Sequence, residues 1–197
     1  MLRRRLTGQV PPDQLSELNQ LVEDTSALGE VVGDLLLSAQ LQRDDVSGAP
    51  VDVRAMAQGV AASLAPLADA NGTSVRAEVD EQDWRVNGAP AALRRALVAL
   101  VDNAISHTPD GSVVIRVSGD RAEVRVAVVD DGEGLDPADT RRLTERFSRG
   151  AAGTGQSRRF GLGLALVDEV VRAHEGRLEL TGAIGEGATV TMVLPRA

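Results

Sequence analysis

The spacing of apolar positions predicts that the chain begins with one long helix. Over residues 13–42, apolar and small side chains recur every three or four positions, beginning with Leu15, Leu18 and Val22, which is the period of an amphipathic helix. The apolar stripe is broad for a single helix, so we expect it to pack against several partners in a helical bundle formed between chains. An ordinary core helix would show the same pattern.

The polar stretch "RDDVSGAP", residues 43–50, separates this helix from a mixed pattern. Because Gly, Pro and Asp interrupt regular structure, we expect a partial helical domain at 1–46 and a second domain at 47–197. Apolar–polar alternation predicts strands there, and three- to four-residue periodicity predicts helices. The expected strands are 51–53, 73–79, 84–86, a pair flanking Gly119-Asp120 and a hairpin within 176–195, and the expected helices are 54–70, 89–106, 137–147 and 162–174.

This order of elements predicts the α/β class, as an α+β two-layer sandwich. Hairpins interspersed with helices indicate a mixed, mostly antiparallel sheet that carries its helices on one face. The long helix of the predicted bundle precedes this sandwich. A Rossmann fold does not fit, because the glycine-rich turn in "RRFGLGLALV" follows a helix and a loop rather than a strand.

Composition narrows the possible chemistry. The chain has 197 residues, a net charge of −8, no cysteine, two histidines and no lysine. Disulfides, thiolate metal sites and the lysine-dependent P-loop are therefore excluded, and a nucleic-acid partner is not expected. No apolar run reaches the length of a membrane helix, and the first residues lack the apolar core of a signal peptide. We expect a cytoplasmic location and no membrane contact for this part of the protein.

The strand "VRVAVVDDGEG" ends in two carboxylates and two glycines. Three of its valines share one face at a period of two, and Asp130 falls on that face, whereas Asp131 points the other way. A carboxylate that ends a buried row needs a partner, because its burial alone is costly. Gly132 and Gly134 allow the backbone to approach a ligand closely. Asp130 is thus either a ligand contact or a cap for the following turn.

The helix in "RRALVALVDNAISHTP" carries a polar group on its apolar face. Ala96, Leu100, Asn103 and His107 follow one another at helical spacing. The amide of Asn103 is either a satisfied core group or a ligand-facing one whose oxygen coordinates a hard cation such as Mg²⁺.

Positive charge gathers before the final helix. Residues 141–159 hold six arginines and one acidic residue, against the negative charge of the whole chain. Within them, "GAAGTGQS" is glycine-rich and leads toward a helix N-terminus, which is typical of a lid over phosphates. A solvated helix face with an irregular loop is the alternative.

In this order, the segments resemble the ATP-binding domain of sensor histidine kinases, DNA gyrase and related chaperones. "LVALVDNAISHTP" resembles the N box, "VVDDGEGL" the first glycine box, "LTERFSRG" the F box and "FGLGLALV" the second glycine box, over roughly 51–197. Residues 13–53 are similar to the second helix and linker of the kinase dimerisation hairpin, which favours sensor histidine kinases.

The resemblance implies roles for individual residues. Asp130 would accept the adenine amino group, Asn103 would ligate Mg²⁺, and Gly132 and Gly134 would shape the adenine pocket. Gly161 and Gly163 would present N–H groups to the phosphates, Phe147 and Arg149 would lie at the base of the lid, and Asn103 and Arg149 would be catalytic. The resemblance also places at the ATP site His107, Arg158, Arg159, Leu162 and Leu164.

Several departures qualify the implied activity. Ser106 stands where the family usually has a lysine or arginine that contacts phosphate. Arg159 stands in place of a glycine, and Ala99 in place of an asparagine. Neither His107 nor His174 has the setting of a phosphoacceptor, so the chain is expected to be a fragment that begins between the hairpin helices.

The predicted function is therefore that of the ATP-binding catalytic part of a sensor histidine kinase. It would transfer the ATP γ-phosphoryl group to a histidine on the missing helix. The parent protein, a membrane-anchored receptor, would form a homodimer through 13–42 and act on a response regulator. The alternatives are a weakened nucleotide-binding scaffold, an anti-sigma-type serine kinase, and an ATPase of the gyrase branch.

Overall fold

The computed structural model describes residues 49–135 and 158–197. The long helix predicted over 13–42, the domain at 1–46 and the helix predicted over 137–147 lie outside this part, as do the side chains of 158–162. Within the described residues, no helix is long and apolar enough to cross a membrane.

Every strand and helix predicted within the described ranges is present, with shifted ends. The elements are β1 (Pro50–Asp52), α3 (Val53–Ala70), β2 (Ser74–Val79), β3 (Arg85–Asn87), α4 (Pro90–Ser106), β4 (Ser112–Gly119), β5 (Glu123–Asp130), α6 (Arg158–Ala173), β6 (Arg177–Gly182) and β7 (Ala188–Pro195). Most limits differ from the prediction by one or two residues. The exception is α6, which begins four residues before the predicted start.

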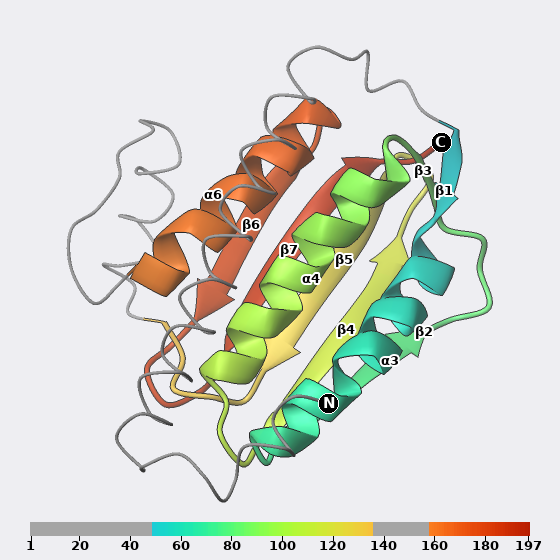
Figure 1. Ribbon diagram of the computed structural model, residues 1–197. Helices are drawn as coiled ribbons and strands as arrows, with labels where there is room; N and C mark the ends of the chain where they lie inside the picture. Colours follow the sequence, from blue (N-terminus) through green and yellow to red (C-terminus); the bar gives the residue numbers. More distant parts are fainter. Residues whose placement is uncertain (1–48, 136–157) are drawn as a thin grey trace, which may run out of the picture. The chain divides into compact units, whose positions relative to one another are not determined.

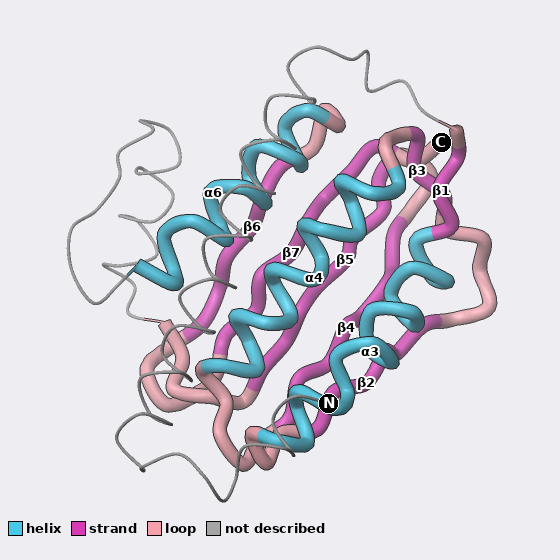
Figure 2. The backbone as a smooth tube through the Cα atoms, in the orientation of Figure 1, coloured by secondary structure: helices cyan, strands magenta, loops and turns pink. Residues whose placement is uncertain are grey.

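The predicted sandwich is confirmed. Among the described residues, five strands form one sheet in the order β2-β4-β5-β7-β6, in which β2 and β4 are parallel and the other neighbouring pairs are antiparallel. The three described helices cover one face of this sheet (Figure 1; Figure 2). β1 and β3 form a separate antiparallel pair at one end.

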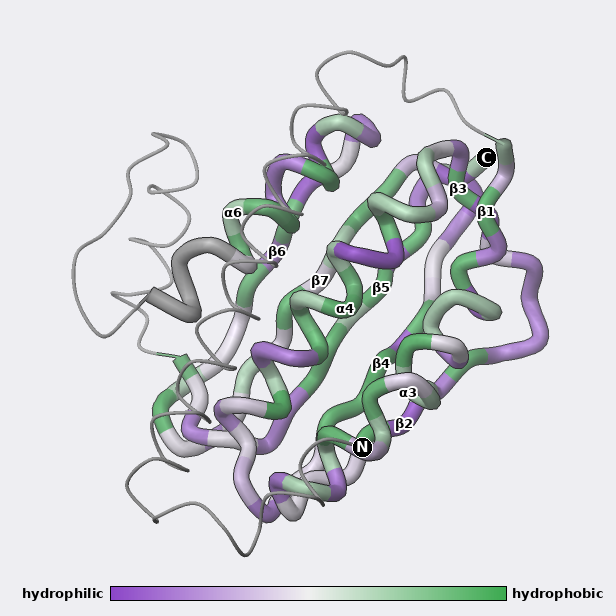
Figure 3. The backbone as a smooth tube through the Cα atoms, in the orientation of Figure 1, coloured by the Kyte–Doolittle hydropathy of each residue, from purple (hydrophilic) through white to green (hydrophobic). Residues whose placement is uncertain are grey.

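The core lies between the sheet and the helices. On β5, alternate valines at 124, 126 and 128 are buried, whereas the intervening residues remain partly exposed. The helices supply leucine, valine and alanine to the same layer, and Figure 3 shows hydrophobic residues along α4 and along the central strands. The apolar faces that the strand alternation and the helical periodicity predict thus pack together in one apolar layer.

The single tryptophan closes the end of the sheet at which β4 and β5 are joined. Trp84 is 3% exposed, and its Nε1–H donates to Asp80 Oδ1 at 2.8 Å. The guanidinium of Arg196 lies 4.8 Å from the centre of the indole ring, at cation–π distance. The close packing of Trp84 against Gly119 places it at the end of β4 opposite Ser112.

Candidate functional site

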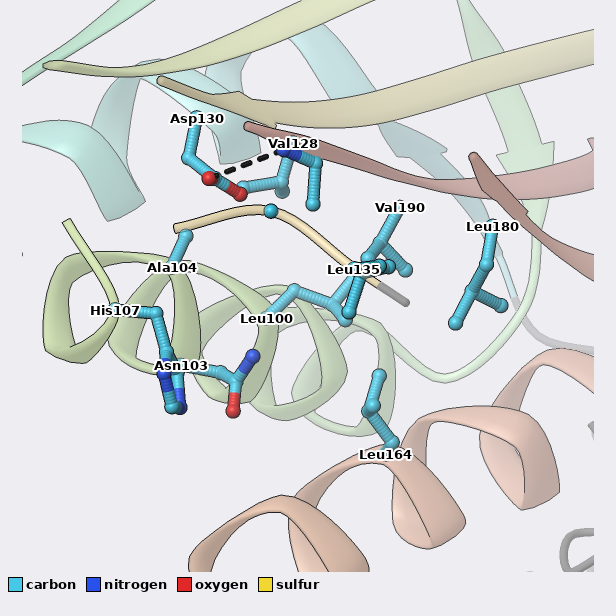
Figure 4. A pocket seen from close by; sticks show the side chains of 12 residues that line it. Leu100, Asn103, Ala104, His107, Val128, Asp130, Leu135, Leu164, Leu180 and Val190 are labelled. Atoms are coloured by element: carbon cyan, nitrogen blue, oxygen red, sulfur yellow. Dashed lines mark hydrogen bonds between the residues drawn. The ribbon is translucent and has the colours of Figure 1, made fainter. Parts of the chain in front are cut away.

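A cavity opens where the C-terminal halves of α4 and β5 meet α6 and the β6–β7 hairpin. It encloses about 460 Å³, including its open mouth. Figure 4 shows the side chains that surround it. The lining residues are Leu100, Asn103, Ala104, His107, Val128, Asp130, Gly134, Leu135, Leu164, Leu180, Ala188 and Val190.

Most of the cavity wall is apolar and comes from both layers of the sandwich. Leu100 and Ala104 project from α4, Val128 and Val190 from the sheet, and Leu164 from α6 (Figure 4). An apolar lining with a few convergent polar groups is typical of a site for a flat organic ring. Here the polar groups are Asp130, Asn103 and His107.

Asp130 ends β5 on the buried face, as predicted, and it is half-buried. Its Oδ1 accepts the Gly132 N–H at 3.1 Å and the Ala188 N–H at 3.2 Å, the latter drawn in Figure 4. No other described residue donates to its Oδ2. Burial raises the pKa of Asp130, and the two backbone N–H groups oppose this effect. One oxygen therefore caps the turn while the other is available to a ligand, so the two interpretations of Asp130 are compatible.

Three glycines allow close backbone packing around this carboxylate. A Cβ on Gly132 would overlap the His107 carbonyl oxygen, and one on Gly134 would overlap the Ala183 carbonyl oxygen. Gly187 has a φ of +77° and packs against the Asp130 carbonyl oxygen, which leaves no room for a side chain. Gly132 and Gly134 were predicted from the sequence, whereas Gly187 was interpreted only as part of a hairpin turn.

Asn103 and His107 lie one helical turn apart on α4 and border the cavity (Figure 4). The Asn103 amide makes no hydrogen bond to another described side chain or backbone group, so its oxygen is available to a ligand. His107 Nδ1 lies 2.5 Å from Glu133 Oε1, which fixes the orientation of the ring. Sequence reasoning missed Glu133, because this contact joins the end of α4 to the turn after β5.

The residues present fit a hard cation bound together with a ligand, rather than one held in a protein cage. Among the described residues, no three His, Asp or Glu side chains are grouped as a metal site. Mg²⁺ commonly takes one or two protein oxygens and completes its coordination with water and phosphate oxygens. The amide oxygen of Asn103 is suited to that arrangement.

The start of α6 differs from the prediction. Because the helix begins at Arg158, Gly161 lies in its first turn, where N–H groups have no acceptor within the helix. Gly163 lies in the second turn, where its N–H donates within the helix, so the predicted phosphate contact of this N–H does not fit the structure. No described residue approaches within 4 Å of the place where its side chain would be. Leu164 is buried and lines the cavity, as predicted for the site.

The structure thus brings together five predicted site residues: Asn103, His107, Asp130, Gly134 and Leu164. Gly132 lies beside them through its hydrogen bond to Asp130. Phe147 and Arg149 lie outside the described residues. The side chains of Arg158, Arg159 and Leu162 also lie outside them, so the roles predicted for these residues stay predictions.

The sequence is similar to known sensor proteins. The family model "Histidine kinase-, DNA gyrase B-, and HSP90-like ATPase" matches residues 88–197. The phosphate regulon sensor protein PhoR of Pseudomonas aeruginosa is 36% identical over 190 residues, or 92% of this chain and 42% of that protein. The sensor-like histidine kinase SenX3 of Mycobacterium tuberculosis is 34% identical over 180 residues, or 87% of this chain and 43% of that protein.

The fold is also similar to that of a solved structure. Full-length ShkA in complex with AMPPNP matches with a TM-score of 0.76 and 28% identity, over 98% of this chain and 41% of that chain. The chain therefore spans less than half of the length of each of these three proteins.

Proposed function

Because the chain belongs to the histidine kinase-, DNA gyrase B- and HSP90-like ATPase family and carries the ATP-binding catalytic domain of a histidine kinase, we propose that the cavity holds the adenine of ATP and that the parent protein transfers the γ-phosphoryl group to a protein histidine. Asp130 carries this proposal: it is a half-buried carboxylate with one oxygen engaged by the backbone and the other available at the end of an apolar cavity.

Asp130 recognises the base in this proposal. Its Oδ2 accepts a hydrogen bond from the adenine amino group, and the leucine and valine side chains pack on the faces of the ring. The backbone N–H groups of Gly132 and Ala188 hold the carboxylate in place through Oδ1. The carboxylate must be ionised to make the stronger, charge-assisted form of this bond.

The phosphates extend toward the opposite wall, where Asn103 lies. Its amide oxygen would hold Mg²⁺, which neutralises charge on the phosphates. The N–H group of Gly161, in the first turn of α6, would face the phosphates, with Phe147 and Arg149 at the base of the lid. Ser106 brings no charge to the phosphates, and its hydroxyl donates to the Asp102 carbonyl oxygen. Arg158 and Arg159 would supply the positive charge that is missing at position 106.

In the transfer step, an imidazole nitrogen of the acceptor histidine attacks the γ-phosphorus. The bond between that phosphorus and the β,γ-bridging oxygen breaks, ADP leaves, and the imidazole proton passes to solvent. Positioning and charge neutralisation supply most of the catalysis. We place the acceptor on a dimerisation helix that precedes 13–42 in the parent, a homodimer. A response regulator would receive the phosphoryl group in the cytoplasm.

The alternatives raised from the sequence, which are a scaffold, a serine kinase and an ATPase of the gyrase branch, are not favoured. The named relatives are a sensor protein and a histidine kinase.

Calorimetry with ATP in the presence and absence of Mg²⁺ tests this assignment, using the wild-type chain and Asn103→Ala. We expect Mg²⁺ to strengthen ATP binding to the wild type by about fivefold, which corresponds to roughly 1 kcal/mol. Asn103→Ala should remove that gain and leave the affinity without Mg²⁺ unchanged. An equal Mg²⁺ effect in both proteins would exclude Asn103 as a ligand.

Phosphoryl transfer requires a second assay. The chain is mixed with a helical hairpin of a related kinase that carries the acceptor histidine, and acid-labile labelling from ATP is followed. Labelling that depends on the histidine supports the kinase assignment. ATP binding without any labelling of the hairpin contradicts it.

A further inference from the structure

His174 follows α6 and is buried, with 6% of its surface exposed. Its Nδ1–H donates to the Val170 carbonyl oxygen at 2.7 Å, one turn earlier in the helix. Its Nε2 accepts the Ala89 N–H at 3.0 Å. Because a backbone N–H can only donate, Nε2 must be unprotonated, and the ring is the neutral tautomer with its proton on Nδ1.

This contact caps the start of α4. Ala89 is the N-cap residue of that helix and has no side-chain group to offer, and Pro90 follows it. The imidazole satisfies the Ala89 N–H from another helix, as the glutamate of a capping box does from within its own helix. The α4 N-terminus therefore depends on a residue 85 positions away.

The backbone beside Ala89 is shaped for the imidazole. A Cβ on Gly88 would overlap the Cδ2 and Nε2 atoms of His174 and would also approach the Leu93 side chain. Gly88 is buried. The absence of a side chain at this position makes the space that the ring occupies.

The two helices joined here also form opposite walls of the cavity. α4 begins beside the end of α6 and runs antiparallel to it, and the two helices pack along their length (Figure 1). Asn103 lies 14 residues beyond Ala89, about 21 Å along the helix. Leu164 lies ten residues before His174 and faces the cavity.

We propose that neutral His174 is a positioning residue for the nucleotide site, because it fixes the spacing between α4 and α6 at the end of the helix pair remote from the cavity. It touches no nucleotide. It acts through α4, which carries Asn103, and through α6, which carries Leu164. The inference rests on the proposed function, since nucleotide affinity is its functional readout.

Protonation of His174 would disrupt this contact, because a charged imidazole donates from both nitrogens and leaves the Ala89 N–H without an acceptor. Burial lowers the pKa of His174 below 6.5, and the Val170 carbonyl oxygen opposes that effect. No charged side chain among the described residues contributes to the shift. Its charged neighbours along the chain, Arg172 and Glu175, are exposed.

The sign of the pH effect follows. A histidine whose pKa is lowered by folding contributes stability that is fully present above 6.5 and is lost as pH falls through the folded pKa. Protonation of Asp130 would also weaken ATP binding as the pH falls, because Asp130 is the adenine acceptor and its pKa is raised. A variant is therefore needed to separate the pH effect of His174 from that of Asp130.

Gly88→Ala and Gly59→Ala form a matched pair for this test. At position 88 the new methyl group displaces the imidazole, whereas at position 59 on α3 the one described atom that it meets is Arg94 Nη1, at 3.4 Å. At pH 7.5 we expect Gly88→Ala to weaken ATP binding about fivefold, the effect of losing one hydrogen bond. Gly59→Ala should bind as the wild type does. Equal ATP affinities in the two folded variants would overturn the proposal.

His174→Gln supplies the pH test and stays informative if Gly88→Ala does not fold. The glutamine carbonyl oxygen accepts the Ala89 N–H without titrating, so this variant should bind ATP within about twofold of the wild type at pH 7.5. Below pH 6.5 its affinity should fall less steeply than that of the wild type, because protonation of position 174 no longer contributes to the loss. Identical pH profiles would contradict the proposal.

NMR of the imidazoles separates this inference from the proposed function. The chain has two histidines, so each ring can be assigned. We expect His174 to be neutral at pH 7 with its proton on Nδ1, and a proton on Nε2 would overturn the inference. Failure of the wild-type chain to bind ATP would overturn the proposed function instead, while the tautomer would still test the contact.

Discussion

Asp130→Asn is expected to weaken ATP binding by about ten- to hundredfold, because it removes a hydrogen bond to a charged acceptor worth roughly 1.5–3 kcal/mol. The asparagine carbonyl oxygen can still accept the Gly132 and Ala188 N–H groups, which hold the side chain in its present orientation. Its Nδ2 then faces the adenine amino group, so that two donors meet. Calorimetry with ATP measures the loss directly.

The same substitution should leave the ligand-free protein at least as stable. Burial raises the pKa of Asp130, so its contribution to stability is fully present below 3.8 and is lost as pH rises through the folded pKa. The ionised carboxylate carries a desolvation cost that a neutral amide avoids. Thermal unfolding without nucleotide should show an unchanged or higher midpoint.

Asp131→Asn is the matched control for Asp130→Asn. Asp131 is exposed and accepts the Ser112 N–H and hydroxyl, each at 2.7 Å, and these bonds lower its pKa. We expect this variant to keep its ATP affinity and to lose about 1 kcal/mol of stability. If the two variants bound ATP equally well, the adenine contact would belong to neither carboxylate and Asp130 would lose its assigned role.

Gly187→Ala is expected to destabilise the fold by about 3–5 kcal/mol. An alanine in the left-handed region costs about 1–2 kcal/mol, and the overlap with the Asp130 carbonyl oxygen adds a steric cost of similar size or larger. The β5–β7 register pairs Asp130 with Ala188. Displacing this backbone should therefore also disturb the carboxylate and weaken ATP binding.

Gly185→Ala separates the two contributions. Gly185 has the same φ of +77°, and no atom of the described residues lies within 4 Å of its added Cβ. We expect it to lose only the conformational cost of about 1–2 kcal/mol. Chemical denaturation of both variants gives the difference, which isolates the steric contribution. Equal losses of stability would mean that the Gly187 backbone moves freely away from Asp130.

Local patterns were sufficient to predict the sheet, the helices and one side of the site. Alternation along β5 placed Asp130 on the buried face, and helical spacing placed Asn103 and His107 toward one cavity. Both inferences use periodicities of a single element, which the sequence displays directly. The order of the motifs, rather than any one of them, indicated the family.

The remaining site contacts depend on how distant elements meet. Ala188 reaches Asp130 through the pairing of β5 with β7, and Glu133 reaches His107 through the turn after β5. His174 looked unremarkable in the sequence, because its acceptor role requires α4 and α6 to lie side by side. No periodicity of one segment encodes such contacts. The early start of α6 is a similar case, since neither glycine in its first turns stopped the helix.

The position of Trp84 has an optical consequence. It is the only tryptophan, the chain has no tyrosine, and no aromatic side chain other than His107 lines the cavity among the described residues. Trp84 packs against Gly119, which pairs with Val124, six residues or about 20 Å along β5 from Asp130. We therefore expect intrinsic fluorescence to report the unfolding of this domain and to stay unchanged when nucleotide binds, so that stability and affinity can be measured independently in one sample.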